Sequence, residues 1–340
     1  MKLLKKTMQA GLTVIFFGLL ATNTVFADNS EGWQFVQENG RTYYKKGDLK
    51  ETYWRVIDGK YYYFDSLSGE MVVGWQYIPA PHKGVTIGPS PRQEIAFRPD
   101  WFYFGQDGVL QEFVGKQVLE AKTATNTNKH HGEEYDSPAE KRVYYFEDQR
   151  SYHTLKTGWV YDDGDWYYLQ KDGGFDSRIN RLTVGELARG WVKDYPLTYD
   201  EEKLKPAPWY YLDPATGIMQ TGWQHLGNKW YYLRSSGAMA TGWYQDGSTW
   251  YYLDAENGDM KTGWQNLGNK WYYLRSSGAM ATGWYQEGST WYYLNASNGD
   301  MKTGWFQVNG NWYYAYDSGA LAVNTTVGGY YLNYNGEWVK

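Results

Sequence analysis

The stretch that decides the fold runs from Gly222 to Thr262 and reads GWQHLGNKWYYLRSSGAMATGWYQDGSTWYYLDAENGDMKT. A near copy follows at once, from Gly263 to Thr303, and the two 41-residue blocks differ at four positions only. Within these blocks and just beyond them, a Gly-Trp pair recurs in steps of 20 and 21 residues, at Trp223, Trp243, Trp264, Trp284 and Trp305. A fixed period of this size is typical of an array of small structural repeats.

Each repeat has the pattern of a β-hairpin. Residues 221–226 and 229–234 are short aromatic-rich runs on either side of Gly227-Asn228, and Asp246-Gly247 is expected to be the turn of the next unit. Such pairs accept the positive φ angles of tight hairpin turns. A single hairpin is marginally stable in water, so the repeats are expected to stack on their neighbours as a solenoid.

The composition excludes several other classes of protein. The chain has 340 residues, with 19 Trp, 35 Tyr, 12 Phe and 39 Gly, and it has no cysteine. Disordered chains are poor in aromatic residues, a disulfide scaffold needs cysteine, and helical bundles favour Ala, Leu, Glu and Lys. We therefore predict an all-β fold, a solenoid of short β-hairpin repeats.

The pattern continues upstream in a degraded form. Trp33, Trp54 and Trp75 are 21 residues apart, and three insertions interrupt the array, at residues 78–100, 115–142 and 192–208. We predict three segments: a signal peptide over residues 1–27, degenerate repeats with inserted loops over 28–190, and a regular repeat solenoid over 191–340. The repeats leave no separate catalytic domain.

Residues 1–27 have the features of a secretory signal peptide. Lys2, Lys5 and Lys6 precede an apolar stretch over residues 10–20, and Val25-Phe26-Ala27 fits a signal peptidase site. A membrane anchor is the alternative, but the stretch is short for a hydrocarbon core of ~30 Å. Its removal takes away three lysines and no acidic residue, which leaves a chain more acidic than the −5 of the full sequence. We expect a secreted protein without a membrane span and without affinity for nucleic acid.

The aromatic pattern predicts cation-binding cages. Strand residues alternate faces, and a repeat of this length carries more ring area than its thin interior can hide. Rings left partly exposed at each hairpin junction could surround a quaternary ammonium, at ~0.5–2 kcal/mol per ring. One cage would bind weakly, and several cages facing a repetitive polymer would gain avidity of ~10²–10⁴.

The units with the pattern TGWxxxxxxWYYLxxxGxM resemble the choline-binding repeats of pneumococcal surface proteins, closely over residues 221–316 and more loosely over residues 33–211. The resemblance implies a left-handed superhelix of hairpins, cell-wall association without a covalent link, and binding of choline or phosphocholine on teichoic and lipoteichoic acids. It also implies a site at each junction, built from the Gly-Trp tryptophan, the first aromatic residue of WYY, the last tyrosine of the next unit, and a methionine.

Carried onto this sequence, the resemblance implies four choline sites, and three looser sets depart from the pattern. The four are Trp223, Trp230, Tyr252 and Met239; Trp243, Trp250, Tyr273 and Met260; Trp264, Trp271, Tyr293 and Met280; and Trp284, Trp291, Tyr314 and Met301. The looser sets are Trp191, Trp209, Tyr232 and Met219; Trp305, Trp312 and Tyr331, with Leu321 in the methionine place; and Trp54, Tyr61, Tyr103 and Met71.

No catalytic constellation stands out, so we expect no enzyme, no metal and no cofactor. His130-His131 lies in a polar insertion, where a solvated loop explains it better than a metal site does. Asp162, Asp163 and Asp165 have the spacing of a turn between Trp159 and Trp166. A catalytic domain also needs a core of its own, and the repeats fill nearly the whole chain.

Three functions remain open. The first is a non-catalytic wall protein that occupies choline sites and competes with choline-dependent wall hydrolases or docks onto them. The second is a glucan-binding, lectin-like protein, although sugar sites usually add polar residues beside the rings. The third is a surface adhesin that uses the degenerate half and its insertions.

Overall fold

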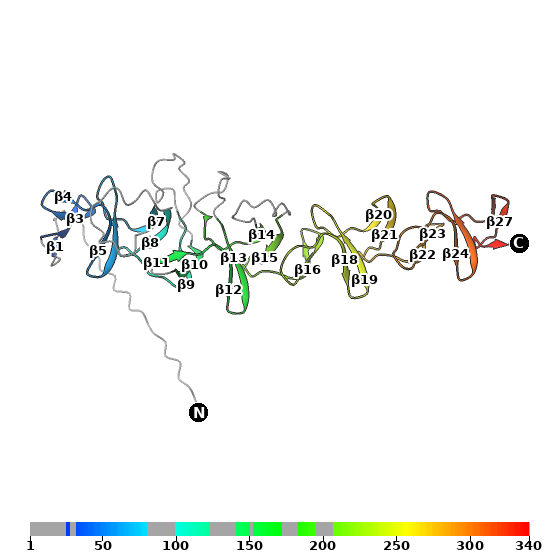
Figure 1. The fold of residues 1–340 in the computed structure, drawn as a ribbon, viewed down its shortest axis with the longest axis horizontal. Helices are drawn as coiled ribbons and strands as arrows, with labels where there is room; N and C mark the ends of the chain where they lie inside the picture. Colours follow the sequence, from blue (N-terminus) through cyan, green and yellow to red (C-terminus); the bar gives the residue numbers. More distant parts are fainter. Residues whose placement is uncertain are drawn as a thin grey trace, which may run out of the picture. The chain divides into compact units, whose positions relative to one another are not determined.

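The structure of the protein is a computed structural model, and it describes residues 25–27, 32–79, 99–122, 141–149, 152–171, 183–194 and 207–339. Most of the predicted signal peptide lies outside these residues, as do His82, His130 and His131. The described part consists of strands and turns without an α-helix, which confirms the predicted all-β fold (Figure 1). It contains no helical segment long and apolar enough to pass through a membrane.

The chain divides into two compact units, which we call unit 1 and unit 2. Unit 1 comprises residues 1–157 and 171–186, and unit 2 comprises residues 158–170 and 187–340. The predicted division between residues 190 and 191 follows the regularity of the repeats rather than their contacts, and it stays a prediction.

Unit 1 is built from antiparallel strands that form two hairpins, β5-β6 and β7-β8, and two larger sheets, β1-β2-β3-β4 and β11-β10-β9. Its strands are β1 (Val25–Ala27), β2 (Gln34–Glu38), β3 (Arg41–Lys46), β4 (Leu49–Lys50), β5 (Tyr53–Ile57), β6 (Lys60–Phe64), β7 (Gly74–Pro79), β8 (Pro99–Phe104), β9 (Gly115–Glu120), β10 (Lys141–Gln149) and β11 (Tyr152–Leu155).

Unit 2 is a succession of seven two-stranded hairpins and a final three-stranded sheet, β26-β27-β28, in chain order (Figure 1). Its strands are β12 (Gly158–Asp162), β13 (Asp165–Leu169), β14 (Gly190–Lys193), β15 (Trp209–Leu212), β16 (Gly222–Leu226), β17 (Lys229–Leu233), β18 (Gly242–Asp246), β19 (Thr249–Leu253), β20 (Gly263–Leu267), β21 (Lys270–Leu274), β22 (Gly283–Glu287), β23 (Thr290–Leu294), β24 (Gly304–Val308), β25 (Asn311–Ala315), β26 (Thr325–Val327), β27 (Tyr330–Leu332) and β28 (Trp338–Val339).

The hairpin turns differ between alternate repeats. In β16-β17 both turn residues have positive φ, 56° at Gly227 and 62° at Asn228, as their sequence predicts. In β18-β19 the expected turn of Asp246-Gly247 is shifted by one residue, because Asp246 pairs with Thr249 and the turn is Gly247-Ser248. The register that places Trp243 opposite Tyr252 fixes this turn.

The two faces of each hairpin carry different side chains. Trp223 lies opposite Tyr232, and Trp230 shares this face because it is two residues from Tyr232 along the same strand. Tyr231 and Leu233 lie on the other face, where Leu233 is completely buried. The equivalent leucines, at the end of each WYYL motif, are the recurring core of unit 2: Leu169, Leu212, Leu253, Leu274 and Leu294.

Successive hairpins are connected by a backbone hydrogen bond at a recurring position. The Met260 N–H, which follows hairpin β18-β19, donates to the Trp230 carbonyl of the preceding hairpin at 2.7 Å. Met280 makes the same bond to Trp250 and Met301 to Trp271. Each methionine is therefore held beside the first WYY tryptophan of the hairpin before its own.

Candidate aromatic cages

One junction shows the geometry of a cage most fully. The rings of Trp243 and Trp250, from β18 and β19, are 6.4 Å apart and nearly perpendicular, at 84°. Tyr272, from β21 of the next hairpin, lies 4.9 Å from Trp243 at 67°. Three rings from two hairpins thus meet at steep angles, and the Met280 N–H bonds to the Trp250 carbonyl at 2.7 Å.

These residues border a cavity of about 280 Å³. Its lining is Trp243, Trp250, Tyr272, Met280, Ser297 and Asn298. The volume lies near the lower end of the ~300–1,000 Å³ range of small-molecule sites. The lining has π-faces, a thioether and neutral polar groups but no charged side chain, which suits an apolar cation without N–H donors better than a metal ion.

The same arrangement recurs along unit 2. In each case the Gly-Trp tryptophan contacts the middle tyrosine of the next hairpin, with ring centroids 4.6–5.0 Å apart. In each case the residue in the methionine place donates its N–H to the first WYY tryptophan. The further sets are Trp159, Trp166, Tyr210 and Met219; Trp191, Trp209, Tyr231 and Met239; Trp223, Trp230, Tyr251 and Met260; Trp264, Trp271, Tyr292 and Met301; and Trp284, Trp291, Tyr313 and Leu321.

The predicted sets differ from these in the tyrosine and the methionine. Of the predicted tryptophan pairs, Trp243–Trp250 and Trp284–Trp291 are in ring contact at 6.4 Å, while the tyrosine comes one position earlier and the methionine one hairpin later. Tyr252, predicted to lie at Trp223, instead pairs with Trp243 of its own hairpin at 5.2 Å. Met239, predicted at the same site, is bonded to the Trp209 carbonyl. Which of these side chains contact choline stays a prediction.

The remaining predicted tyrosines and methionines are displaced in the same way. Tyr232, Tyr273, Tyr293 and Tyr314 each pair with the Gly-Trp tryptophan of their own hairpin. Met219, Met260, Met280 and Met301 each bond to the first WYY tryptophan of the hairpin before their own. At the last junction Trp305 lies 5.5 Å from Tyr330 rather than meeting Tyr331, and Trp312 begins the WYY run of the same hairpin as Trp305.

One complete set was not predicted. Trp159 and Trp166 lie 6.4 Å apart at 82°, and Tyr210 closes the set at 4.6 Å from Trp159. The signal was present, because Trp159 and Trp166 have the Gly-Trp and WYYL spacing of the regular repeats. It was missed because the tyrosine that completes the set lies beyond the insertion at residues 192–208.

The cages of unit 2 are open to solvent on one side. Trp230, Trp250, Trp271 and Trp291 are 39–43% exposed, which is unusual for so many tryptophans in one protein. In unit 1, by contrast, Trp54 is 5% exposed and packs against Phe102 at 5.2 Å. Trp54 therefore lies in a closed hydrophobic core. The looser set predicted around it, with Tyr61, Tyr103 and Met71, has no exposed tryptophan face at this position.

No group of histidine, aspartate or glutamate side chains with the arrangement of a metal site occurs in the described ranges of the chain. The aspartates predicted to form a turn do so, because Asp163 and Gly164 connect β12 to β13 with positive φ angles of 50° and 91°. These observations define a β-hairpin repeat protein whose candidate sites are aromatic cages between neighbouring hairpins.

Comparison with known proteins gives the family. A sequence model described as a choline-binding repeat matches residues 220–262 and 261–306, and one described as a cell wall binding repeat matches residues 157–175 and 303–321. The chain is 68% identical to CbpJ from Streptococcus pneumoniae TIGR4, with a TM-score of 0.75, and covers all of that structure with 91% of its own length. The chain is 60% identical to choline binding protein F from S. pneumoniae, with a TM-score of 0.76, and it covers all of that structure with 92% of its own length.

The chain belongs to the choline-binding repeat family. It is also 26% identical over 230 residues to glucosyltransferase-S of Streptococcus mutans, in a match that covers 59% of this chain. The chain spans only 13% of the length of that relative, so the likeness concerns a small part of the larger protein.

Proposed function

We propose that the protein is a secreted, non-catalytic wall protein that binds phosphocholine on teichoic and lipoteichoic acids through the cages of unit 2, without a covalent link to the wall. The observation that carries the proposal is the cage of Trp243, Trp250 and Tyr272, whose cavity is lined by rings and a thioether without a charged side chain. Such a lining favours a methylated ammonium, because its charge is spread over methyl groups that need no hydrogen-bond acceptor.

The family membership supports this ligand. Choline binding protein F from S. pneumoniae has been solved in complex with ipratropium, which carries a quaternary ammonium, and in the presence of a peptidoglycan analogue. A chain 60–61% identical to it, with the same repeats, is expected to bind the same class of cation.

Several weak cages on one array would act together on a polymer. A single cage of three rings supplies a few kcal/mol, which corresponds to a Kd of about 1 mM. Teichoic acid repeats its phosphocholine along the chain, so a second bound unit is intramolecular and raises the overall affinity by ~10²–10⁴. The same wall polymer is the anchor of choline-dependent hydrolases, which the protein would displace by competition.

The direct test is a calorimetric titration of residues 28–340 with choline. We expect saturable binding of several cholines, and about one site fewer in the Trp243→Ala, Trp250→Ala double variant. The matched control is Tyr334→Ala, which removes a ring that is 74% exposed and outside the cages. Absence of binding at tens of millimolar choline in the unaltered protein contradicts the proposal.

The competition with hydrolases needs a separate measurement. Release of wall fragments by a choline-dependent hydrolase is expected to slow as the protein is added, and to recover for a variant with several cages removed. An unchanged rate at saturating protein rejects the regulatory part and leaves wall binding intact.

Glucan binding is a second candidate, favoured by the partial match to glucosyltransferase-S. Retention on immobilised glucan that survives excess choline would support it. Retention on choline-bearing wall that is released by free choline supports the first function instead.

A further inference from the structure

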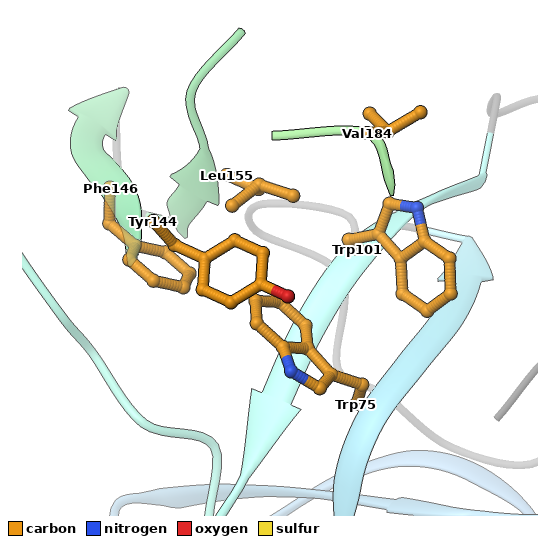
Figure 2. Packing of buried hydrophobic residues seen from close by; sticks show 6 residues of the cluster. All are labelled: Trp75, Trp101, Tyr144, Phe146, Leu155 and Val184. Atoms are coloured by element: carbon orange, nitrogen blue, oxygen red, sulfur yellow. The ribbon is translucent and has the colours of Figure 1, made fainter. Parts of the chain in front are cut away.

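Unit 1 contains a group of three rings with the construction of the cages in unit 2. The rings of Trp75 and Trp101 are 6.2 Å apart at 89°, and Tyr144 lies 4.7 Å from Trp75 at 56°. Figure 2 shows these rings around a common centre, with Leu155 and Val184 beside them. The corresponding values for Trp243, Trp250 and Tyr272 are 6.4 Å at 84° and 4.9 Å at 67°.

The strand register shows that the two groups occupy equivalent positions. Trp75 pairs with Tyr103 as Trp243 pairs with Tyr252, so Trp75 and Trp101 are the two tryptophans of one hairpin. In the next hairpin Gly115 pairs with Phe146, as Gly263 pairs with Leu274. Tyr144 is therefore the middle aromatic residue that corresponds to Tyr272.

The two groups also correspond at the methionine place and at the residue that precedes the neighbouring glycine. The residue after Leu155 donates its N–H to the Tyr145 carbonyl, as the residue after Met280 does to Tyr273, so Leu155 takes the methionine place. Gly185 lies against Leu155 as Gly299 lies against Met280. Val184, which precedes that glycine, thus corresponds to Asn298 on the cavity lining of the other cage.

A lysine of the chain itself occupies this cage. The Lys122 Nζ lies 4.5, 5.1 and 4.2 Å from the ring centroids of Trp75, Trp101 and Tyr144. It donates a hydrogen bond to the Val184 carbonyl at 2.6 Å, and Lys122 is 1% exposed. Cation–π attraction is strongest for an ammonium group that is surrounded by aromatic faces and removed from water.

The position of Lys122 follows from an insertion. The hairpins from β16-β17 to β24-β25 close with two-residue turns, whereas β9 and β10 are joined by residues 121–140, and Lys122 is the second residue after β9. Glu186 provides the nearby negative charge: it accepts a hydrogen bond from the Tyr144 hydroxyl at 3.2 Å and pairs with Arg142 at 3.6 Å. Burial lowers the pKa of Lys122, and the attraction of Glu186 opposes that effect.

We propose that Trp75, Trp101 and Tyr144 form an ammonium site of the same construction as the cages of unit 2, and that Lys122 is its built-in ligand. The choline sites of the proposed function remain in unit 2, while this site is closed to external choline. The inference rests on the proposed function only in the comparison of ligand class, and its test does not depend on choline binding in unit 2.

Chemical rescue tests the assignment. Lys122→Ala empties the cage, and n-propylammonium replaces the atoms from Cγ to Nζ. The Trp75 indole N–H, which donates to the Glu120 carbonyl at 2.7 Å, provides a local probe by nuclear magnetic resonance. We expect its resonance to shift saturably with n-propylammonium in Lys122→Ala, accompanied by a rise in the unfolding temperature of unit 1.

Lys122→Met is the matched control, because an unbranched thioether fills the same space without a charge. We expect no saturable shift of the Trp75 resonance in this variant or in the unaltered protein. The proposal is overturned if Lys122→Ala gives no shift with n-propylammonium, or if all three proteins give the same shift. Tetramethylammonium, used in parallel, shows whether the emptied cage also accepts a methylated cation.

A measurement on the unaltered protein covers the case in which Lys122→Ala does not fold. The ring currents of the three aromatic side chains are expected to move the Lys122 ε-CH₂ resonance upfield of all exposed lysines. This displacement should persist at saturating choline. A Lys122 signal at the position of an exposed lysine, or one that returns there as choline is added, overturns the proposal. Calorimetry of choline binding in unit 2 reports on the proposed function separately.

Discussion

Three of the Gly-Trp tryptophans in unit 2 donate their indole N–H to a carboxylate. Trp223 donates to Asp246 at 3.0 Å, Trp264 to Glu287 at 3.0 Å, and Trp159 to Asp194 at 3.1 Å. The acceptor at Trp223 and Trp264 lies at the end of the first strand of the next hairpin. A carboxylate in this place fixes the orientation of the ring and adds negative charge at the edge of the ring, where it attracts a cation bound nearby.

Glu287→Gln is therefore expected to weaken choline binding at the Trp264 cage by about two- to fivefold, which corresponds to ~0.4–1 kcal/mol. Glutamine still accepts the hydrogen bond but removes the charge. The indole N–H resonance of Trp264, followed during a choline titration, measures the change at this cage alone. The Trp243 resonance is the internal control, and equal affinity at Trp264 before and after the substitution refutes the role of the charge.

Asp254 and Lys261 form an ion pair that is present in one of the two near-identical blocks. The distance from Lys261 Nζ to Asp254 Oδ2 is 2.9 Å, and Asn295 takes the aspartate's place in the second block. The hydrogen bond from Lys261 lowers the pKa of Asp254 to about 2, from 3.8. Because the folded-state pKa is depressed, the pair stabilises the fold above pH ~4 and is lost as the pH falls through about 2.

Asp254→Asn should lower the free energy of unfolding at pH 7 by less than about 1 kcal/mol, as expected of an ion pair at the surface that is partly exposed to solvent. The difference from the unaltered protein should vanish near pH 2. Urea unfolding across this pH range measures it. Asn295→Asp is the reciprocal variant, since Lys302 follows at the place of Lys261, and a pH-independent difference for Asp254→Asn would contradict the assignment.

At this scale the sequence predicted the ring contacts of Trp243 with Trp250 and of Trp284 with Trp291, but not the tyrosines that lie beside them. Trp230 and Tyr232 share a face by strand parity, and that parity alone left open which tyrosine of the next hairpin would face them. In the structure the middle tyrosine, Tyr251, contacts Trp223, because Tyr252 is already paired with Trp243 across its own hairpin. No rule of local sequence states how one hairpin turns relative to the next.

Lys122 could not have been recognised from sequence. It lies in an insertion between residues 115 and 142, where no repeat spacing relates it to Trp75 or Trp101. The cage itself left a trace, since Gly74-Trp75, Trp101 and the motif Val143-Tyr144-Tyr145-Phe146 follow the repeat pattern around two insertions. The two insertions change the spacing between these motifs, so the repeat pattern could not be followed across them.

Among the structural elements, the turn after each hairpin packs against the methionine of a cage formed by the two preceding hairpins. Gly278 has a φ of +83°, and a Cβ at this position would overlap Met260, which lies at the Trp223 cage. Two features of this position therefore require glycine: the left-handed backbone conformation and the close approach of the Met260 side chain. Gly258, Gly299 and Gly319 have the same relation to Met239, Met280 and Met301.

Gly278→Ala is expected to destabilise unit 2 by ~1–3 kcal/mol and to weaken choline binding at the Trp223 cage. Gly268→Ala is the matched control, because Gly268 has a φ of +61° but no atom within 4 Å of the added Cβ. Thermal unfolding and the Trp223 indole resonance give the two readouts. A similar loss of affinity in both variants would show that strain of the backbone, rather than displacement of Met260, governs the cage.

The elements themselves were largely predictable. Gly-Asn turns, alternating aromatic runs and a fixed period predict hairpins of defined length, and β16 to β23 follow the prediction closely. The turn of β18-β19 was predicted one residue too early. Asp-Gly is a strong turn signal in isolation, but pairing of Asp246 with Thr249 leaves the turn to Gly247-Ser248.

For the whole molecule, ligand binding should stabilise one unit more than the other. Each occupied cage adds about RT ln(1 + [L]/Kd), or ~1.4 kcal/mol at a choline concentration ten times the Kd. Unit 2 contains the open cages, whereas Trp54, Trp75 and Trp101 of unit 1 are at most 5% exposed.

We therefore expect choline to raise the unfolding temperature of unit 2 and to leave that of unit 1 nearly unchanged. Differential scanning calorimetry at increasing choline, with assignment of the transitions through Trp75 and Trp250 resonances, measures both. Sodium chloride at equal ionic strength is the control for salt. An equal upward shift of both transitions would mean that the exposure of the rings does not decide where choline binds.

The backbone bond from each methionine to the tryptophan of the preceding hairpin means that a cage belongs to a junction and is not contained in any single repeat. An isolated hairpin has no complete site, and the number of sites rises by one for every hairpin added after the first. Duplication of a 41-residue block such as Gly222–Thr262 inserts two hairpins at once. Duplication of such a block within the chain therefore changes the number of sites in steps of two.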